Sequence, residues 1–157
     1  MVKINFKKIF WFALILIGVF VIAIYFMIPK QVDCKTASVK DMNILHENLA
    51  LHIHPQLTII LDGEKQSLPA NIGVTGNIMR PIHTHDSTGV LHVEAPCQRE
   101  FRLGEFFEVW GKTFSTTCIL DKCDGRITMT VNGVENTLFE NYLMNDNDNI
   151  TITYTSK

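Results

Sequence analysis

The histidines of this chain fall into pairs that could bind a metal ion. Three motifs place two potential ligands two residues apart: His52 with His54, His83 with His85, and His92 with Glu94. In an extended strand, residues two apart point to the same face, so each motif can present both of its ligand atoms on one side. Imidazole is the commonest metal ligand and suits zinc, copper, iron and nickel. The spacing therefore predicts a metal site built on strands.

The segment from His83 to Glu94 holds the densest part of this pattern. Two short strands joined by a turn at 87–89 would bring its three histidines together, and a neighbouring strand could add the earlier pair. Three imidazoles with an open position are the layout of catalytic zinc sites. Four imidazoles, or three with a carboxylate, also suit copper(II) or non-haem iron. We therefore expect a copper or zinc ion, with the histidine ligands His52, His54, His83, His85 and His92.

Two carboxylates accompany these histidines, and one further histidine stands apart. Glu94 and Asp86 are expected either as ligands or as acceptors that fix an imidazole tautomer by taking its other ring N–H. His46 lies alone in a polar connector. We therefore expect that replacing His46 leaves metal binding intact, whereas replacing His83 and His85 together abolishes it.

Alternation of apolar and polar residues predicts the strands that would carry these motifs. Leu51–Leu61 alternates almost throughout, with both of its histidines opposite the apolar face, and predicts one half-buried strand. Asp62-Gly63 is a strong hairpin signal, so Gln66–Ile72 is the expected return strand. Further strands are expected at Ile82–Asp86 and Val90–Ala95, on either side of the central turn.

The second half of the chain is predicted to combine a helix with more strands. Leu103–Trp110 places apolar residues at i, i+3, i+4 and i+7, a spacing typical of a helix with one buried face, and Gly111 should end it. Arg126–Val131 alternates and is followed by Asn132-Gly133, a type I′ hairpin signal. Ile150–Tyr154 is the expected terminal strand.

An apolar segment precedes these elements. Ile9–Ile28 has twenty residues without a charge, long enough to span a bilayer core of ~30 Å. Lys3, Lys7 and Lys8 come before it, so the positive-inside rule places the N-terminus in the cytoplasm and the rest outside. A cleaved signal peptide usually has a shorter apolar region of about 7–15 residues and an A-x-A-like site, which favours a retained anchor here.

The chain is therefore expected to contain one folded domain. We predict a cytoplasmic N-terminus at 1–8, a transmembrane anchor at 9–28, a connector at 29–48 and an extracytoplasmic metal-binding domain at 49–157. The domain should be α+β, mostly antiparallel β with one or two short helices, and a short helix could also form through Val39–Asn48. The net charge of −2, without a basic stripe, argues against nucleic-acid binding.

The cysteines agree with a location outside the cytoplasm. All four lie beyond the apolar segment, and extracytoplasmic domains can keep disulfides. Cys118 and Cys123 flank a short turn and are expected to pair, which leaves Cys34 to pair with Cys97. A soft-metal site formed by Cys118 and Cys123 is the alternative.

The order of the motifs resembles that of a known family. The chain carries HxH at 52–54, a strand ending in Asp-Gly, Leu-Pro-Ala-Asn-Ile-Gly, His-Thr-His-Asp-x-x-Gly-x-x-His-x-Glu and Leu-Gly-x-Phe-Phe-x-x-Trp-Gly. This order is similar to that of a largely uncharacterised family of small exported domains in bacteria and archaea, many of which follow a membrane anchor. The resemblance covers 52–111 and implies that the histidine motifs belong together. A weaker likeness to the first cupin motif rests on Gly76, His83, His85 and Glu94, but here the interval before the glutamate is longer.

Three functions follow from these patterns. The first is a membrane-anchored metal-binding protein, which could handle metal or serve as an accessory subunit beside other membrane-protein subunits. The second is an enzyme, because a three-histidine zinc site lowers the pKa of bound water to ~7. Glu94 or Asp86 would then be the general base for hydrating or hydrolysing a small substrate. The third is a metal-free structural or interaction module whose histidines form a polar patch that becomes charged at about pH 6.

Overall fold

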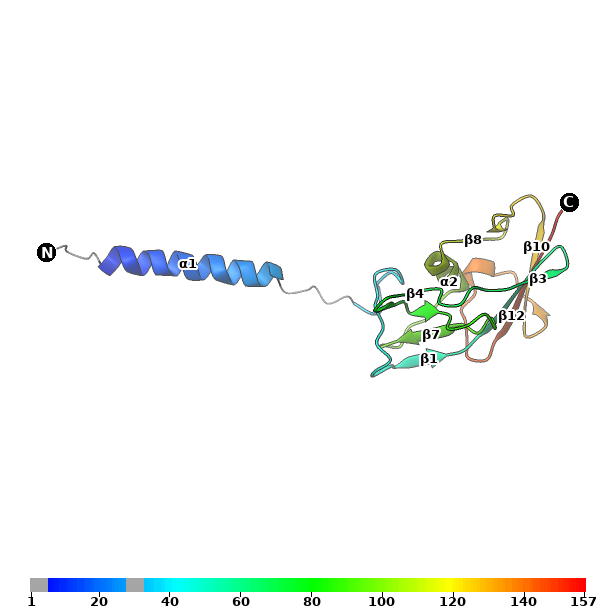
Figure 1. Cartoon of the computed structure of the whole chain (residues 1–157), viewed down its shortest axis with the longest axis horizontal. Helices are drawn as coiled ribbons and strands as arrows, with labels where there is room; N and C mark the ends of the chain where they lie inside the picture. The colour runs from blue at the N-terminus through cyan, green and yellow to red at the C-terminus, as the bar shows by residue number, and fades with distance from the viewer. Residues whose placement is uncertain (1–5, 28–32) are drawn as a thin grey trace. The chain divides into compact units, whose positions relative to one another are not determined.

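The computed structural model describes residues 6–27 and 33–157, which belong to two separate compact units, 1–31 and 32–157. The first unit contains helix α1 (Phe6–Met27), drawn in blue in Figure 1. Its segment Phe10–Met27 has a mean hydropathy of 2.7 and is long and apolar enough to cross a membrane. Residues 1–5 and 28–32 lie outside the described residues. They include Lys3, Ile28, the start of the predicted cytoplasmic N-terminus and the first part of the predicted connector.

The second unit contains two main sheets and two hairpins of very short strands. The strands of the three-stranded sheet, in spatial order, are β1 (Leu51–Ile53), β7 (His92–Ala95) and β6 (Ile82–His83). Those of the five-stranded sheet are β11 (Val134–Glu135), β10 (Arg126–Val131), β12 (Asn149–Thr155), β2 (Gln56–Leu61) and β3 (Glu64–Gln66). The hairpins pair β4 (Val74–Thr75) with β5 (Ile78–Met79), and β8 (Thr113–Phe114) with β9 (Ile119–Leu120).

Pairing within the described strands is antiparallel except between β12 and β2, which run parallel. Two short helices complete this unit, α2 (Leu103–Trp110) and the 3-10 helix η1 (Phe139–Asn141). Figure 1 shows β1 and β7 side by side, apart from β10 and β12 in the other sheet. The unit is therefore α+β and mostly antiparallel, as the sequence predicts.

The core joins the two sheets and α2. Leu57 and Ile59 alternate along β2, and both are buried beside apolar residues of β10 and β12. Phe106 and Phe107 fill the buried face of α2, which ends where Gly111 adopts a φ of 71°. Burial of such large apolar side chains stabilises a fold by about 1.5–3 kcal/mol each, so this core fixes the sheet on which the histidines lie.

Proline residues explain two departures from the predicted strands. Leu51–Leu61 is two strands in different sheets, broken at His54-Pro55, because proline has no N–H to donate to a ladder. The carbonyl of Pro55 instead accepts the N–H of Leu91 at 2.9 Å. The return strand predicted at Gln66–Ile72 is instead β3, which begins at Glu64 and ends at Gln66, before Pro69. The predicted strands at Ile82–Asp86 and Val90–Ala95 shorten to β6 and β7.

The connector differs more from its prediction. Residues 39–48 form turns and bends rather than a helix, and the described part of the connector packs against the domain. Val39, Met42 and Ile44 are buried, and the N–H of Ile44 donates to the carbonyl of Met79 at 2.8 Å. The connector forms no helix because burial of these side chains and hydrogen bonds to the domain replace helical ones.

Several predicted elements have the predicted bounds. The helix at Leu103–Trp110 and the strand at Arg126–Val131 are confirmed, and Asn132 and Gly133 both have positive φ, as a type I′ turn requires.

Two disulfides are present, Cys34–Cys97 and Cys118–Cys123. Both Cys118 and Cys123 are thus oxidised, and the alternative of a thiolate metal site is not supported.

The turn between β6 and β7 packs directly on β2 and should be sensitive to substitution. Gly89 has a φ of 92°, its carbonyl accepts the N–H of Leu57 at 2.8 Å, and an added Cβ would meet the carbonyl oxygen of Leu57. We expect Gly89→Ala to reduce the free energy of unfolding by about 3 kcal/mol, measured by urea unfolding of the full chain in detergent. The control is Gly63→Ala, where φ is 86° but the space is open, with an expected loss of about 1 kcal/mol. Equal losses would contradict this packing argument.

Candidate metal centre

The three-stranded sheet gathers the histidine motifs on one face. β7 is the central strand, and its His92 and Glu94 share a face because they are two residues apart. The register pairs Glu94 with His52 of β1, and His92 with His83 of β6. Directly opposed side chains have Cβ atoms about 4.5–5.5 Å apart, so strand pairing alone brings these four groups together.

Three more histidines join this face from the ends of the sheet and from the connector. His54 follows β1, and its ring centroid lies 4.8 Å from that of His92. His85 follows β6, and its ring centroid lies 4.5 Å from that of His92. The connector brings His46, whose ring lies 6.0 Å from that of His85. We call the seven residues the histidine cluster: His46, His52, His54, His83, His85, His92 and Glu94.

Glu94 lies at the centre of the cluster, fully buried. Its Oε2 is 3.0 Å from Nδ1 of His46, and its Oε1 is 3.1 Å from Nε2 of His52 and 3.9 Å from Nδ1 of His92. Neither oxygen has a hydrogen bond to a described residue, so the imidazoles approach closely without hydrogen-bond alignment. A buried charged group is costly unless it is paired or coordinates a metal ion.

His83 is the most rigidly held ligand candidate. It is fully buried, and its Nδ1 lies 3.0 Å from the carbonyl of Arg80. Because a carbonyl only accepts, Nδ1 carries the proton and Nε2 presents its lone pair to the cluster. That Nε2 lies 3.2 Å from Nε2 of His85. Nε2–H of His85 can donate a hydrogen bond to it at this distance, and two imidazole nitrogens bound to one tetrahedral ion at 2.0–2.1 Å would be ~3.3 Å apart, so the distance suits either arrangement.

Burial favours the neutral, metal-binding form of two histidines. It lowers the pKa of His83 to about 4, although the hydrogen bond to Arg80 opposes the shift. Burial also lowers the pKa of His92, and the neighbouring His85 adds to the effect. Metal ions bind neutral imidazole, so both shifts favour the form of the ring that binds metal.

The potential ligand atoms form three overlapping groups in the described chain. Within each group the atoms lie within 4.8 Å of one another: His46, His83 and His85; His52, His54 and His92; His83, His92 and Glu94. All five histidines predicted as ligands, and Glu94, thus lie where one or more metal ions could be held.

Two aspartates, Asp86 and Asp146, lie outside the three ligand groups. Asp86, a predicted ligand or orienting group, is exposed, and its Oδ1 accepts from the N–H and hydroxyl of Thr88. These hydrogen bonds lower the pKa of Asp86, which joins none of the three groups. Asp146, absent from the prediction, accepts the backbone N–H of His54 at 2.8 Å and lies 3.8 Å from its Nδ1.

His46 is the main residue that sequence reasoning missed. It was expected to stand apart, yet it lies against Glu94 and groups with His83 and His85. One signal could have found it, because the expected Cys34–Cys97 disulfide returns the connector to a position three residues beyond Glu94. Arg99 strengthens this attachment by donating to the carbonyl of Ala37 at 2.8 Å.

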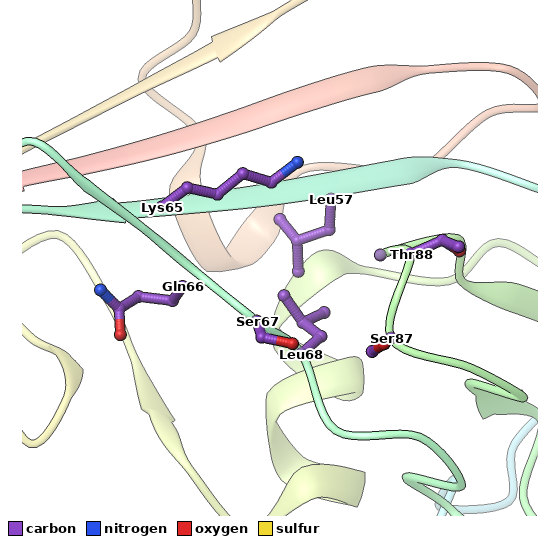
Figure 2. A pocket seen from close by; sticks show the side chains of 8 residues that line it. Leu57, Lys65, Gln66, Ser67, Leu68, Ser87 and Thr88 are labelled. Carbon is purple, nitrogen blue, oxygen red and sulfur yellow. The ribbon is translucent and has the colours of Figure 1, made fainter.

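A separate pocket lies between the β2–β3 hairpin and the turn at 87–89. It has a volume of about 230 Å³, and Figure 2 shows Leu57 and Leu68 close together inside it, with Ser87 and Thr88 beside them. Among the described residues, those that line it include no histidine, cysteine or carboxylate. It therefore adds no ligands to the candidate metal centre.

No family model matches the chain, and comparisons with the curated proteins and with the solved structures gave no match. The resemblance to small exported domains therefore stays a prediction.

The buried His83 should make the metal-free protein sensitive to acid. Its folded pKa of about 4 lies below the ordinary 6.5, so the unfolded chain binds more protons between these values and stability falls as the pH is lowered through them. We expect His83 to contribute a loss of about 2 kcal/mol between pH 6.5 and pH 5, measured by urea unfolding after chelator treatment. In ¹H–¹⁵N NMR spectra at pH 5.5, His83 should remain neutral and protonated at Nδ1. Titration of His83 near its ordinary pKa would show that its burial is wrong.

Proposed function

We propose that this protein binds copper(II) or zinc at the histidine cluster, in a domain held outside the cytoplasm by a membrane anchor. The observation that carries the proposal is Glu94, whose two buried carboxylate oxygens have no hydrogen bond but face imidazole nitrogens. A metal ion would supply the missing positive charge and use the lone pairs of the same imidazoles. The order of the histidine motifs in this chain resembles that in a family of exported domains, which supports a single site built from all of these motifs.

The chemistry of the ligands supports these two metals. The three groups contain imidazole and carboxylate, and no cysteine of the described chain is free. Nitrogen and oxygen ligands favour copper(II) and zinc over copper(I). Histidine ligands in known metal sites are usually oriented by an acceptor on their other ring nitrogen. Here Nδ1 of His83 faces the carbonyl of Arg80, and Nδ1 of His54 lies beside the carboxylate of Asp146.

Exposure of the outer ligands favours metal handling over a structural ion. The side chains of His46, His52 and His54 are 55%, 46% and 40% exposed, whereas Glu94 is buried. Structural zinc sites are usually closed, and an ion here could enter or leave without unfolding of the core. We propose that the domain acquires or transfers metal, and that other membrane-protein subunits are its partners.

Two features support the proposed location. The segment Phe10–Met27 is long and apolar enough to cross a membrane. The disulfides Cys34–Cys97 and Cys118–Cys123 are stable in oxidising compartments. Together they support a single-pass protein with its second unit outside the cytoplasm.

Replacing Glu94 should have opposite effects on the metal-free and metal-bound protein. Glu94→Gln removes an unpaired buried charge, so the melting temperature without metal should equal or exceed that of the unmodified chain. The same variant loses a ligand, so its affinity for zinc should fall at least ~100-fold. The measurements are calorimetry and elemental analysis of the full chain in detergent, without a histidine tag.

Glu47→Gln is the matched control, because Glu47 is exposed and next to His46 in the chain. It should leave both the melting temperature and the affinity unchanged. No zinc or copper uptake by the unmodified chain would contradict the proposal and favour the metal-free interaction module.

The anchor makes a separate prediction about location. In membranes from expressing cells, the full chain should stay in the pellet after alkaline carbonate washing, because a retained apolar helix is not released by high pH. Protease added from outside to intact spheroplasts should degrade the second unit. Release by carbonate, or protection until the cells are lysed, would contradict the retained anchor or its orientation.

A further inference from the structure

We propose that the histidine cluster holds two metal ions bridged by the carboxylate of Glu94, an inference that rests on the proposed metal-binding function. The two oxygens of Glu94 face different imidazoles, Oε2 facing His46 and Oε1 facing His52 and His92. Each oxygen thus points to a different group of three histidines. The first set is His46, His83 and His85, and the second set is His52, His54 and His92.

The first set has the geometry of three imidazoles around one ion. Nε2 of His83 and Nε2 of His85 are 3.2 Å apart, close to the ~3.3 Å expected for neighbouring ligands of a tetrahedral ion. Nδ1 of His46 lies 3.0 Å from Oε2 of Glu94. A first ion would therefore be held by the three nitrogens of this set, with Oε2 of Glu94 beside one of them.

The second set repeats this arrangement on the other oxygen. Nε2 of His52 and Nδ1 of His92 lie 3.1 Å and 3.9 Å from Oε1 of Glu94. The ring centroid of His54 is 4.5 Å from that of His52 and 4.8 Å from that of His92. A second ion would be held by the three nitrogens of this set, with Oε1 of Glu94 beside His52 and His92.

The third group of ligand atoms joins the two sets. His83 of the first set, His92 of the second and Glu94 have ligand atoms within 4.8 Å of one another. Shared carboxylates are compatible with the separations of about 3.5–4 Å found in two-metal sites. A single zinc ion takes four ligands and copper(II) prefers a tetragonal arrangement, so one ion would leave several of the six imidazoles unused.

Two nearby aspartates reduce the positive charge of a two-ion centre. Two divalent ions with one bridging carboxylate carry a large positive charge, and nearby anions lower its cost. Asp146 has its Oδ1 3.8 Å from Nδ1 of His54, and Asp86 is close enough to His85 and His92 for their charges to affect its pKa. Asp146 therefore lies beside a histidine of the second set, and Asp86 is near enough to the cluster to interact with it electrostatically.

The test is copper(II) binding to the full chain in detergent, without a tag and after chelator treatment. We expect two equivalents of copper per chain by elemental analysis after desalting. Electron paramagnetic resonance should then show less spin than bound copper, because a carboxylate bridge couples the two ions. Zinc should also bind at two equivalents.

Paired variants assign each ion to its set. His46→Ala with His85→Ala should leave one equivalent with its full spin, and so should His52→Ala with His54→Ala. At saturating copper, Glu94→Gln should restore uncoupled spin because the bridge is lost. Glu47→Gln should keep two coupled ions, and circular dichroism of each variant checks its fold.

The outcomes separate this inference from the proposed function. One equivalent of copper and of zinc in the unmodified chain would overturn the two-ion centre and leave metal binding intact. No uptake of either metal would overturn both proposals. Two equivalents with full, uncoupled spin would overturn the bridge by Glu94, and this result needs no variant.

Discussion

The arrangement of the site depends on a carboxylate buried among imidazoles. Glu94 lies on the central strand of a three-stranded sheet, so each neighbouring strand presents a histidine beside it or beside His92. The carboxylate is buried without a hydrogen bond, which is costly, and burial lowers the pKa of His83 and so favours its neutral form. A metal ion would suit both groups, since it binds a carboxylate and neutral imidazoles together.

The alternation that places these side chains on one face of the sheet also attaches the sheet to the core. Ile82, Val93 and Ala95 alternate with His83, His92 and Glu94 and are fully buried. They belong to the same core as Phe106 and Phe107 of α2 and the apolar residues of the five-stranded sheet. The inner ligands are therefore held by packing, as a preorganised metal site requires, whereas His46, His52 and His54 remain accessible to solvent.

Local patterns in the sequence predict the parts of the fold that depend on neighbouring residues. The two-residue spacing of the histidine motifs, the helix at Leu103–Trp110 and the turn at Asn132-Gly133 follow from strand, helix and turn geometry. The break at Pro55 could also have been predicted, because proline disrupts a ladder. Hairpin pairings follow from the turns, but the parallel pairing of β2 with β12 could not be predicted, because it joins residues about ninety positions apart. His46 was missed for the same reason, since its role comes from where the connector folds back.

The two sets of histidines differ in how the fold holds them, and this difference bears on how metal would be handled. His52, His54 and His92 lie on or directly after paired strands. The first set is completed by His46, which lies in a connector fixed by the Cys34–Cys97 disulfide, by Arg99 and by the burial of Met42 and Ile44. The second set belongs to the sheet and to the residue that follows β1, whereas the first also requires the connector to be in place. An oxidising compartment, where that disulfide persists, is therefore the environment in which all ligands of the cluster are held together.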